Sequence, residues 1–399
     1  MRSYKTEIDP NNVQRTAFLN HAGAARWAYN WGLSRNVDEY ESTGKRLSSI
    51  DLHRELVQLK KAEVPWLCEV SKWAPQEALR NLDHAFSEFF RRCKTGKGKP
   101  GFPKYKSRKN GIGTFTLGQI IRITDRTIQL PRIGKVRLKE RGYLPTDERI
   151  INATVSECAG RWFVSVLVDA EPRREMGTEI LGVDVGAKSM AVLSDGTTFE
   201  NPRALIKATK RLRMLHKAVS RKSKGSANRK KAVVRLARHH YRVACVRSDA
   251  IHKSTDAIAK RAAVVGIEDL NVAGMLKNHK IARALSDASM SEFHRQLEYK
   301  MAWAGGEVVK ADRWFPSSKM CSWCGEIKGD LKLSDREFVC IWCGFEADRD
   351  VNAAINLRDM AVGSTVSACR LGSAGRDPIS VKLLTGQEPN ATEANGLGG

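Results

Sequence analysis

CSWCGEIKGDLKLSDREFVCIWCGFEADRDVNAAINL, residues 321–357, places two cysteine pairs directly before a short acidic cluster. Cys321 and Cys324 are separated by fifteen residues from Cys340 and Cys343, which is the spacing of a zinc ribbon held by four thiolates. The intervening segment is short and charged, so without a metal it would have almost no apolar core to fold it. We therefore predict a structural zinc ion whose four positions are all filled by sulfur, which excludes a catalytic role for it.

The acidic cluster consists of Asp348 and Asp350, which flank Arg349. It directly precedes a segment with helical spacing, VNAAINL. Two residues apart on a helix, the two carboxylates would point about 200° away from each other, so only one can face a metal site. Ala353 and Ala354 would let this helix approach a sheet closely. We expect the ribbon to fix where the helix begins and where its acid lies; the alternative is a ribbon that contacts only nucleic acid.

Two further acids stand where apolar segments end. Asp184 lies in ILGVDVGAKSMAV and Glu268 in AAVVGIEDL, each at the predicted end of a strand. Taken singly, such acids are usually solvated turn residues. Together with the acid at the start of the helix, they are the parts of a two-metal nuclease of the RNase H type, which holds two Mg²⁺ or Mn²⁺ ions about 4 Å apart. Asp350 is our candidate for the third acid.

The charge of the chain points to a polyanionic partner. Its 399 residues include 68 Lys and Arg against 44 Asp and Glu, a formal charge of +24. Residues 203–247 contain 16 Lys or Arg and no Asp or Glu, which favours a basic helical hairpin along a phosphate backbone. The candidate contacts are Arg211, Arg213, Arg221, Lys222, Arg229 and Lys230, with Lys104, Lys106 and Arg108 from a Gly- and Pro-rich basic connector.

Apolar runs of only a few residues exclude insertion into a membrane. The start, MRSYKTEIDP, lacks the apolar stretch of a secretory signal, so we expect a cytoplasmic protein with reduced cysteines.

The periodicity predicts a multidomain α+β protein. Strand, helix and turn signals give the following boundaries: a strand of a small antiparallel barrel at 1–11, a helical lobe at 12–108, the rest of the barrel at 109–173, a mixed α/β nuclease domain at 174–312, the zinc ribbon at 313–346, the last nuclease helix at 347–362 and a disordered tail at 363–399.

Several of these stretches resemble one family. GVDVGAKSMAVLSDG, VVGIEDLNV, HRQLEYKMAWAGGEVVKADRWFPSSKMCSWCG and DRDVNAAINL are similar to TnpB, the RNA-guided nuclease encoded by certain insertion sequences and related to type V CRISPR effectors. The resemblance implies a RuvC-like nuclease domain, a helical recognition lobe and a wedge barrel. It also implies a guide RNA from the transposon end and a short target-adjacent motif in double-stranded target DNA. Asp184, Glu268 and Asp350 match the positions of the three RuvC acids.

The same resemblance implies that Lys72, Gln76 and Thr116 read the target-adjacent motif. We expect one protomer to bind each guide RNA, and the sequence leaves two protomers open. The primary interpretation is thus an RNA-guided DNA endonuclease that uses Mg²⁺ for phosphodiester hydrolysis. One alternative is a transposase that joins DNA strands with the same acids, and another is a non-catalytic zinc-ribbon repressor that only binds RNA or DNA.

Overall fold

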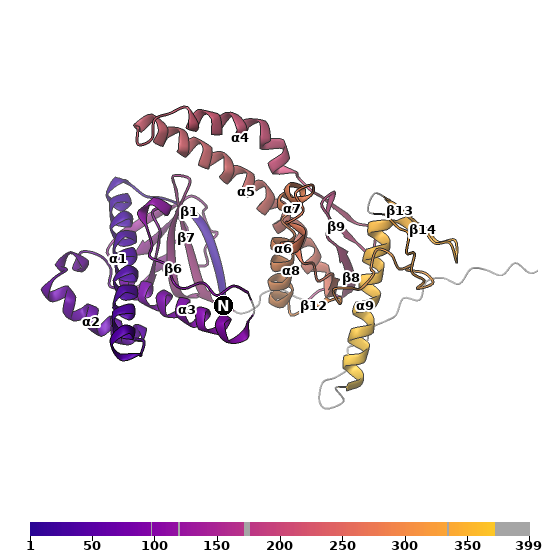
Figure 1. The fold of residues 1–399 in the computed structure, drawn as a ribbon, viewed down its shortest axis with the longest axis horizontal. Coiled ribbons are helices and arrows are strands. Elements are labelled where there is room, and N and C mark those ends of the chain that lie inside the picture. The colour runs from indigo at the N-terminus through magenta and orange to yellow at the C-terminus, as the bar shows by residue number, and fades with distance from the viewer. Residues whose placement is uncertain (97, 119, 171–175, 333–334, 372–399) are drawn as a thin grey trace, which may run out of the picture. The chain divides into compact units, whose positions relative to one another are not determined.

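The computed structural model describes residues 1–96, 98–118, 120–170, 176–332 and 335–371 (Figure 1). The chain divides into two units, one formed by residues 1–173 and 203–249 and the other by residues 174–202 and 250–399. Each unit has its own hydrophobic core. No helix in these described ranges has the length and hydropathy needed to cross a bilayer.

The N-terminal helices of the first unit lie between Asn12 and Thr95, within the residues that the sequence assigned to a helical lobe. They are α1 (Asn12–Thr43), α2 (Ser49–Ala62), the 3-10 turn η1 (Pro65–Cys68) and α3 (Trp73–Thr95). Capping boxes at Asn11 and Ser48 explain where α1 and α2 begin, because each side chain accepts a hydrogen bond from the third helical N–H. Gly44 ends α1 in the left-handed conformation that favours glycine.

Seven antiparallel strands form the sheet of this unit, in the order β2-β6-β7-β1-β5-β4-β3. They are β1 (Arg2–Asp9), β2 (Thr114–Gly118), β3 (Arg122–Ile123), β4 (Thr127–Leu130), β5 (Gly134–Leu138), β6 (Arg149–Cys158) and β7 (Arg161–Asp169). The N-terminal strand joins this sheet between β7 and β5, as predicted. Phe18 of α1 packs against Phe115 and Trp162 of the sheet at ring distances of 5.9 and 4.9 Å, so lobe and sheet share one core. Closure of the sheet into a barrel stays a prediction.

The basic segment folds as the predicted helical hairpin of α4 (Ala204–Ser220) and α5 (Ala227–Arg261). Residues 203–249 lie between two parts of the second unit in the sequence, but in the structure they belong to the first unit. Tyr241 of α5 explains this, because its ring lies 5.7 Å from that of Phe163 in β7 and under the guanidinium of Arg161.

The second unit contains a five-stranded mixed sheet of order β10-β9-β8-β11-β12. Strands β8, β11 and β12 are parallel, and β9 and β10 are antiparallel additions. The elements are β8 (Glu179–Asp184), β9 (Ser189–Leu193), β10 (Thr198–Glu200), β11 (Ala262–Ile267), β12 (Glu307–Lys310), α6 (Val272–Met275), α7 (Ala282–Ala288), α8 (Met290–Ala304), the hairpin β13 (Glu337–Val339) and β14 (Glu346–Asp348), and α9 (Arg349–Leu371).

The end of α9 corrects one boundary. Residues 363–371 were predicted to belong to a disordered tail, but the helix continues to Leu371. The stretch VGSTVSACRL contains one glycine and no proline, and a single glycine weakens a helix without ending it. The remainder of the predicted tail, residues 372–399, lies outside the described residues.

Candidate active site and zinc ribbon

The first two candidate acids leave the sheet at the same edge. Asp184 is the last residue of β8, and Glu268 directly follows β11. These strands run parallel with Val183 opposite Ile267, so the two acids that come next are neighbours at the carboxyl ends of the strands. Asp350 lies in the first turn of α9, which packs on β8 and β11 (Figure 1). The structure therefore brings together three residues that are far apart in the sequence.

Two glycines allow α9 to lie directly on these strands. A Cβ atom added to Gly182 would lie 1.7 Å from the carbonyl oxygen of Ala354, and one added to Gly266 would lie 2.1 Å from that of Leu357. Each glycine stands two residues before an acid, in Gly182-Val-Asp184 and Gly266-Ile-Glu268. The predictions from sequence did not use this repeated pattern, although it marks where the helix contacts the strands. The predicted close approach of the helix at Ala354 is confirmed, since this residue is fully buried.

Gly182→Ala is expected to destabilise the protein by at least about 3 kcal/mol and to reduce any activity that depends on Asp350. The added methyl group would meet helix backbone, which cannot move aside as a side-chain tip can. Thermal unfolding measures the change. Gly363→Ala in the same helix is the matched control, because no atom lies within 4 Å of its added Cβ. Equal melting temperatures for both variants would show that α9 does not press on β8.

The acids form one electrostatic cluster. Burial raises the pKa of Asp184 well above its usual range, and the carboxylates of Glu268 and Asp350 raise it further, while Arg349 opposes the shift. Asp348 makes a smaller contribution in the same direction. Neighbouring carboxylates repel one another when ionised, and a bound cation relieves that repulsion.

Two of the three acids interact with other side chains of the same chain. The Ser317 hydroxyl donates a short hydrogen bond to Glu268, and the Arg349 guanidinium lies 3.3 Å from the Asp350 carboxylate. Within the described residues, only the four ribbon cysteines bring three or more possible ligand atoms within 4.8 Å of one another. The three acids are thus spaced more widely than the ligands of one ion. Their oxygen donors suit Mg²⁺ or Mn²⁺. With two ions, no single ion would have to contact all three of Asp184, Glu268 and Asp350.

Asp348 has a different local role from Asp350. Its Oδ1 accepts hydrogen bonds from the backbone N–H groups of Asp350 at 2.8 Å and Val351 at 3.3 Å. This is the geometry of an N-cap, which stabilises the exposed donors at the start of a helix. Asp348 also ends β14, so the same residue joins the zinc-ribbon hairpin to α9.

Asp184→Asn is expected to raise the melting temperature of the metal-free protein by about 2–4 °C at pH 7.5, equivalent to about 1 kcal/mol. A carboxyl whose pKa is raised by folding costs stability as pH rises above about 4, and the neutral amide removes that cost. The gain should shrink as pH falls toward 4. Thermal melts in chelator at several pH values measure it.

Asp195→Asn is the control with the opposite sign. Despite burial, hydrogen bonds from Arg261 and from the backbone of Thr197 lower the pKa of Asp195, so this carboxylate stabilises the folded chain as an anion. Its replacement should lower the melting temperature at neutral pH. A destabilising effect of Asp184→Asn at pH 7.5 would contradict the repulsive cluster.

The four ribbon cysteines have the geometry of a closed zinc site. Their sulfurs lie 3.7 Å apart for Cys321 and Cys343 and 3.6 Å apart for Cys324 and Cys340. Tetrahedral ligands at about 2.3 Å from zinc lie about 3.8 Å apart, whereas disulfide sulfurs lie about 2.05 Å apart. Backbone N–H groups of Cys343 and Trp342 lower the pKa of Cys340 to about 6, which favours its thiolate. Against a backbone hydrogen bond from Glu326, burial and the neighbouring sulfurs raise the pKa of Cys324 to about 12, so the match to zinc rests on the sulfur geometry. The residues present therefore fit the predicted zinc.

The ribbon is bound to the start of α9. The Asn352 and Asn356 amides each donate to the Met320 carbonyl at 2.7 Å, and Asn356 also donates to the Ser317 carbonyl at 2.7 Å. The Ser322 N–H donates in return to Asn352 at 3.0 Å. Both asparagines are buried. A ribbon that fixes the beginning of α9 agrees with these contacts, and the acid Asp350 lies in the same turn.

The candidate residues for the target-adjacent motif lie where α3 meets β2. Lys72 precedes α3 and is exposed, Gln76 is half-buried in its first turn, and Thr116 of β2 forms a hydrogen bond of 2.9 Å with Thr154. Thr116 also lines a cavity of about 330 Å³ whose wall includes Glu77 of α3.

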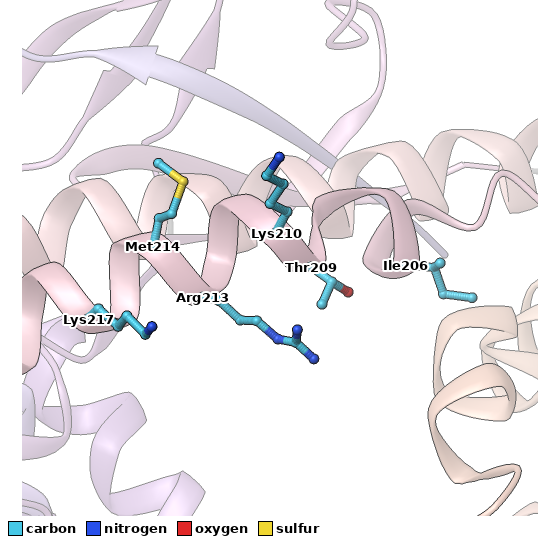
Figure 2. A pocket seen from close by; sticks show the side chains of 6 residues that line it. All are labelled: Ile206, Thr209, Lys210, Arg213, Met214 and Lys217. Carbon is cyan, nitrogen blue, oxygen red and sulfur yellow. The ribbon is translucent and has the colours of Figure 1, made fainter.

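The candidate phosphate contacts are mostly exposed. In the connector, Lys104, Lys106 and Arg108 are exposed, and the Lys106 ammonium also lies 3.8 Å from the Tyr29 ring, which helps to hold the connector on the lobe. In the hairpin, Arg229 is half-buried and Arg211, Arg213, Arg221, Lys222 and Lys230 are exposed. A hollow of about 520 Å³ lies beside consecutive turns of α4. Its lining side chains, drawn in Figure 2, are Ile206, Thr209, Lys210, Arg213, Met214 and Lys217.

Taken together, the sheet and the ribbon define a class: zinc-ribbon proteins with a candidate three-carboxylate site at the edge of a parallel-strand sheet. Family profiles match the chain at residues 1–45 (OrfB IS605 helix-turn-helix domain), 163–279 (OrfB IS605, "Probable transposase") and 291–357 (Cas12f1-like, TNB domain). The chain belongs to the TnpB family, also called OrfB IS605, and its ribbon is of the Cas12f-like type.

Two curated relatives span nearly the whole chain. A protein of Streptomyces pristinaespiralis named "Putative RNA-guided DNA endonuclease" is 38% identical over 373 residues, covering 92% of this chain and 90% of the relative. InsQ of Escherichia coli K12, with the same description, is 31% identical over 388 residues, covering 92% and 94%. A solved Cas12f1-sgRNA-target DNA complex is 18% identical and covers 90% of this chain and 98% of its own, at a TM-score of 0.35.

Proposed function

We propose that this protein is an RNA-guided DNA endonuclease that hydrolyses phosphodiester bonds at Asp184, Glu268 and Asp350. The observation that carries the proposal is the convergence of these acids from β8, β11 and α9, with Asp184 in electrostatic contact with the other two. The curated relatives that span nine-tenths of the chain have names that describe the same activity. The order of the five strands and the position of the acids also agree with an RNase H-like, RuvC-type domain.

In this proposal, the three carboxylates hold two Mg²⁺ or Mn²⁺ ions, which supply activation of water and stabilisation of the leaving oxygen when bound. The protein contributes the placement of the oxygens. Ser317 orients Glu268 through its hydrogen bond, and the glycine contacts of α9 fix the height of Asp350 above the sheet. Arg349 balances the charge of the cluster and would have to share Asp350 with a cation.

The remaining parts follow the same proposal. Residues 12–108 form the recognition lobe, 109–173 the wedge barrel, 174–312 with 347–362 the nuclease domain, and 313–346 the zinc ribbon. The basic hairpin at 203–247 tracks a phosphate backbone of the guide RNA or of the target DNA, because its charge is not compensated by acids. Lys72, Gln76 and Thr116 read the target-adjacent motif next to the cavity between α3 and β2. One protomer binds each guide RNA.

Sequencing of the RNA that copurifies with the protein tests the proposal. The gene is expressed with its native flanking DNA, and the complex is purified at high salt. We expect one discrete RNA that maps to the 3′ flank and runs past the transposon end, whereas repeat-spacer RNA would indicate a CRISPR effector. Purification without a discrete RNA would contradict RNA guidance.

Strand transfer is the second candidate, favoured by the family profile described as "Probable transposase". Joined transposon ends in an assay with the same purified complex would support it over hydrolysis. Hydrolysis alone would exclude it.

A further inference from the structure

The loop that leads from β12 into the zinc ribbon carries the most exposed aromatic side chain of the described residues. Trp314 is 85% exposed. Of the nine tryptophans in the chain, the three most exposed are Trp314, Trp323 and Trp342, all in the ribbon segment. Exposure of so large an apolar ring costs free energy in water, so this ring is a candidate for contact with a ligand.

Short contacts fix this loop to the acid-bearing strand on both sides of Trp314. Before it, the Ala311 N–H donates to the Ile267 carbonyl at 2.8 Å, and Arg313 forms an ion pair of 2.7 Å with Asp269. After it, Ser317 donates its hydroxyl hydrogen to Glu268. The loop is therefore bound to residues 267, 268 and 269, which surround the second acid.

Hydrogen bonds within the loop also fix its backbone. The Trp314 N–H donates to the Asp312 carboxylate at 2.9 Å, and the Phe315 N–H donates to the Asp312 carbonyl at 3.0 Å. The turn closes on Asp312 and leaves the indole in solvent. Trp314 precedes Ser317 by three positions, a span of at most about 11 Å along the chain. Trp314 thus lies on the short loop whose Ser317 contacts Glu268, the second candidate acid.

The charge of the ribbon indicates which part of a nucleic acid it can contact. Residues 313–346 contain five Lys or Arg and five Asp or Glu, and a zinc ion with four thiolates would add two negative charges. Such a segment does not attract a phosphate backbone as the 203–247 hairpin does. An exposed indole instead binds the faces of bases, and those faces are accessible only in a single strand.

We propose that Trp314 stacks on a base of the single DNA strand that is cut and so positions the scissile phosphate at Asp184, Glu268 and Asp350. This inference rests on the proposed endonuclease function and adds a substrate-stacking residue to it. The stack is sequence-tolerant, because every base has a π-face.

The test is single-turnover cleavage by the complete protein–guide RNA complex. Trp314→Ala is expected to slow cleavage about 5- to 150-fold, the range found when one base-stacking aromatic is removed, and Trp314→Phe should restore most of the rate. Trp323→Ala is the matched control, because Trp323 is 78% exposed in the same ribbon but lies outside the 312–317 loop. It should cut within about twofold of wild type.

Abasic substrates separate stacking from a structural role. One abasic nucleotide, moved stepwise along the cut strand, should slow the wild-type complex at the position that stacks on Trp314. The same substrate should not slow Trp314→Ala further. The inference would be overturned if the abasic nucleotide and Trp314→Ala slowed cleavage additively, or if Trp314→Ala cut at the wild-type rate. It would also be overturned if Trp323→Ala lost as much cleavage rate as Trp314→Ala, or if Trp314→Ala changed the oligomeric state of the complex. If the wild-type complex does not cut at all, the proposed function fails, and the inference fails with it.

Discussion

Asp350→Asn is expected to reduce cleavage of the target DNA by at least about a thousandfold, whereas Asp348→Asn should stay within about threefold of wild type. The two acids are separated by one residue, yet the structure gives them different roles. Asp350 interacts with Asp184 across the site, and under the proposed function its replacement would remove a metal ligand worth several kcal/mol to the reaction. Asp348 accepts two backbone hydrogen bonds at the start of α9, and asparagine is an equally good N-cap.

Single-turnover cleavage and electrophoretic binding assays distinguish this result from misfolding. Both variants should retain guide RNA and bind target DNA, since neither residue belongs to the basic hairpin. Cleavage by Asp350→Asn together with an inactive Asp348→Asn would show that the third acid is Asp348.

Cys340→Ser is expected to abolish zinc binding and to reduce cleavage by at least about a hundredfold. A structural zinc contributes about 10 kcal/mol or more. Among the ribbon residues that the structure describes, the buried core consists only of Phe338 and the ligand cysteines Cys321 and Cys340. Without the ribbon, Asn352 and Asn356 lose their carbonyl partners at Met320 and Ser317, and the first turn of α9 loses its anchor.

Zinc content and cleavage rate are measured on the same preparation, with about one zinc ion per chain expected in wild type. Cys93→Ser is the control, because this cysteine is exposed on α3 outside the ribbon. A zinc-free variant that cuts at the wild-type rate would mean that the ribbon does not position the acid.

Local signals predicted much of the fold. A basic helical hairpin was expected at 203–247 and is formed by α4 and α5, and the segment VNAAINL was expected to be helical and lies in α9. Caps, alternation and apolar stripes are encoded in neighbouring residues, so a single sequence displays them. The cysteine spacing is equally local, and the structure brings all four sulfurs together.

Contacts between distant segments were harder to foresee. Ser317 and Glu268 are 49 residues apart, and nothing in either segment indicates their hydrogen bond. The sequence could show that only one of Asp348 and Asp350 faces the site, but assigning the cap to Asp348 required the position of α9. Gly182 and Gly266 could have been found from the sequence, because a glycine two residues before a strand-end acid occurs twice.

The most direct test of RNA-guided cleavage is to reprogram the guide. The guide segment of the copurified RNA is replaced by an unrelated sequence, and the complex is incubated with Mg²⁺ and two plasmids, one matching the old guide and one the new. We predict that cleavage moves to the plasmid that matches the new guide and that Asp350→Asn cuts neither. Cleavage that stays at the old site, or that proceeds on both plasmids without regard to the RNA, would contradict the account.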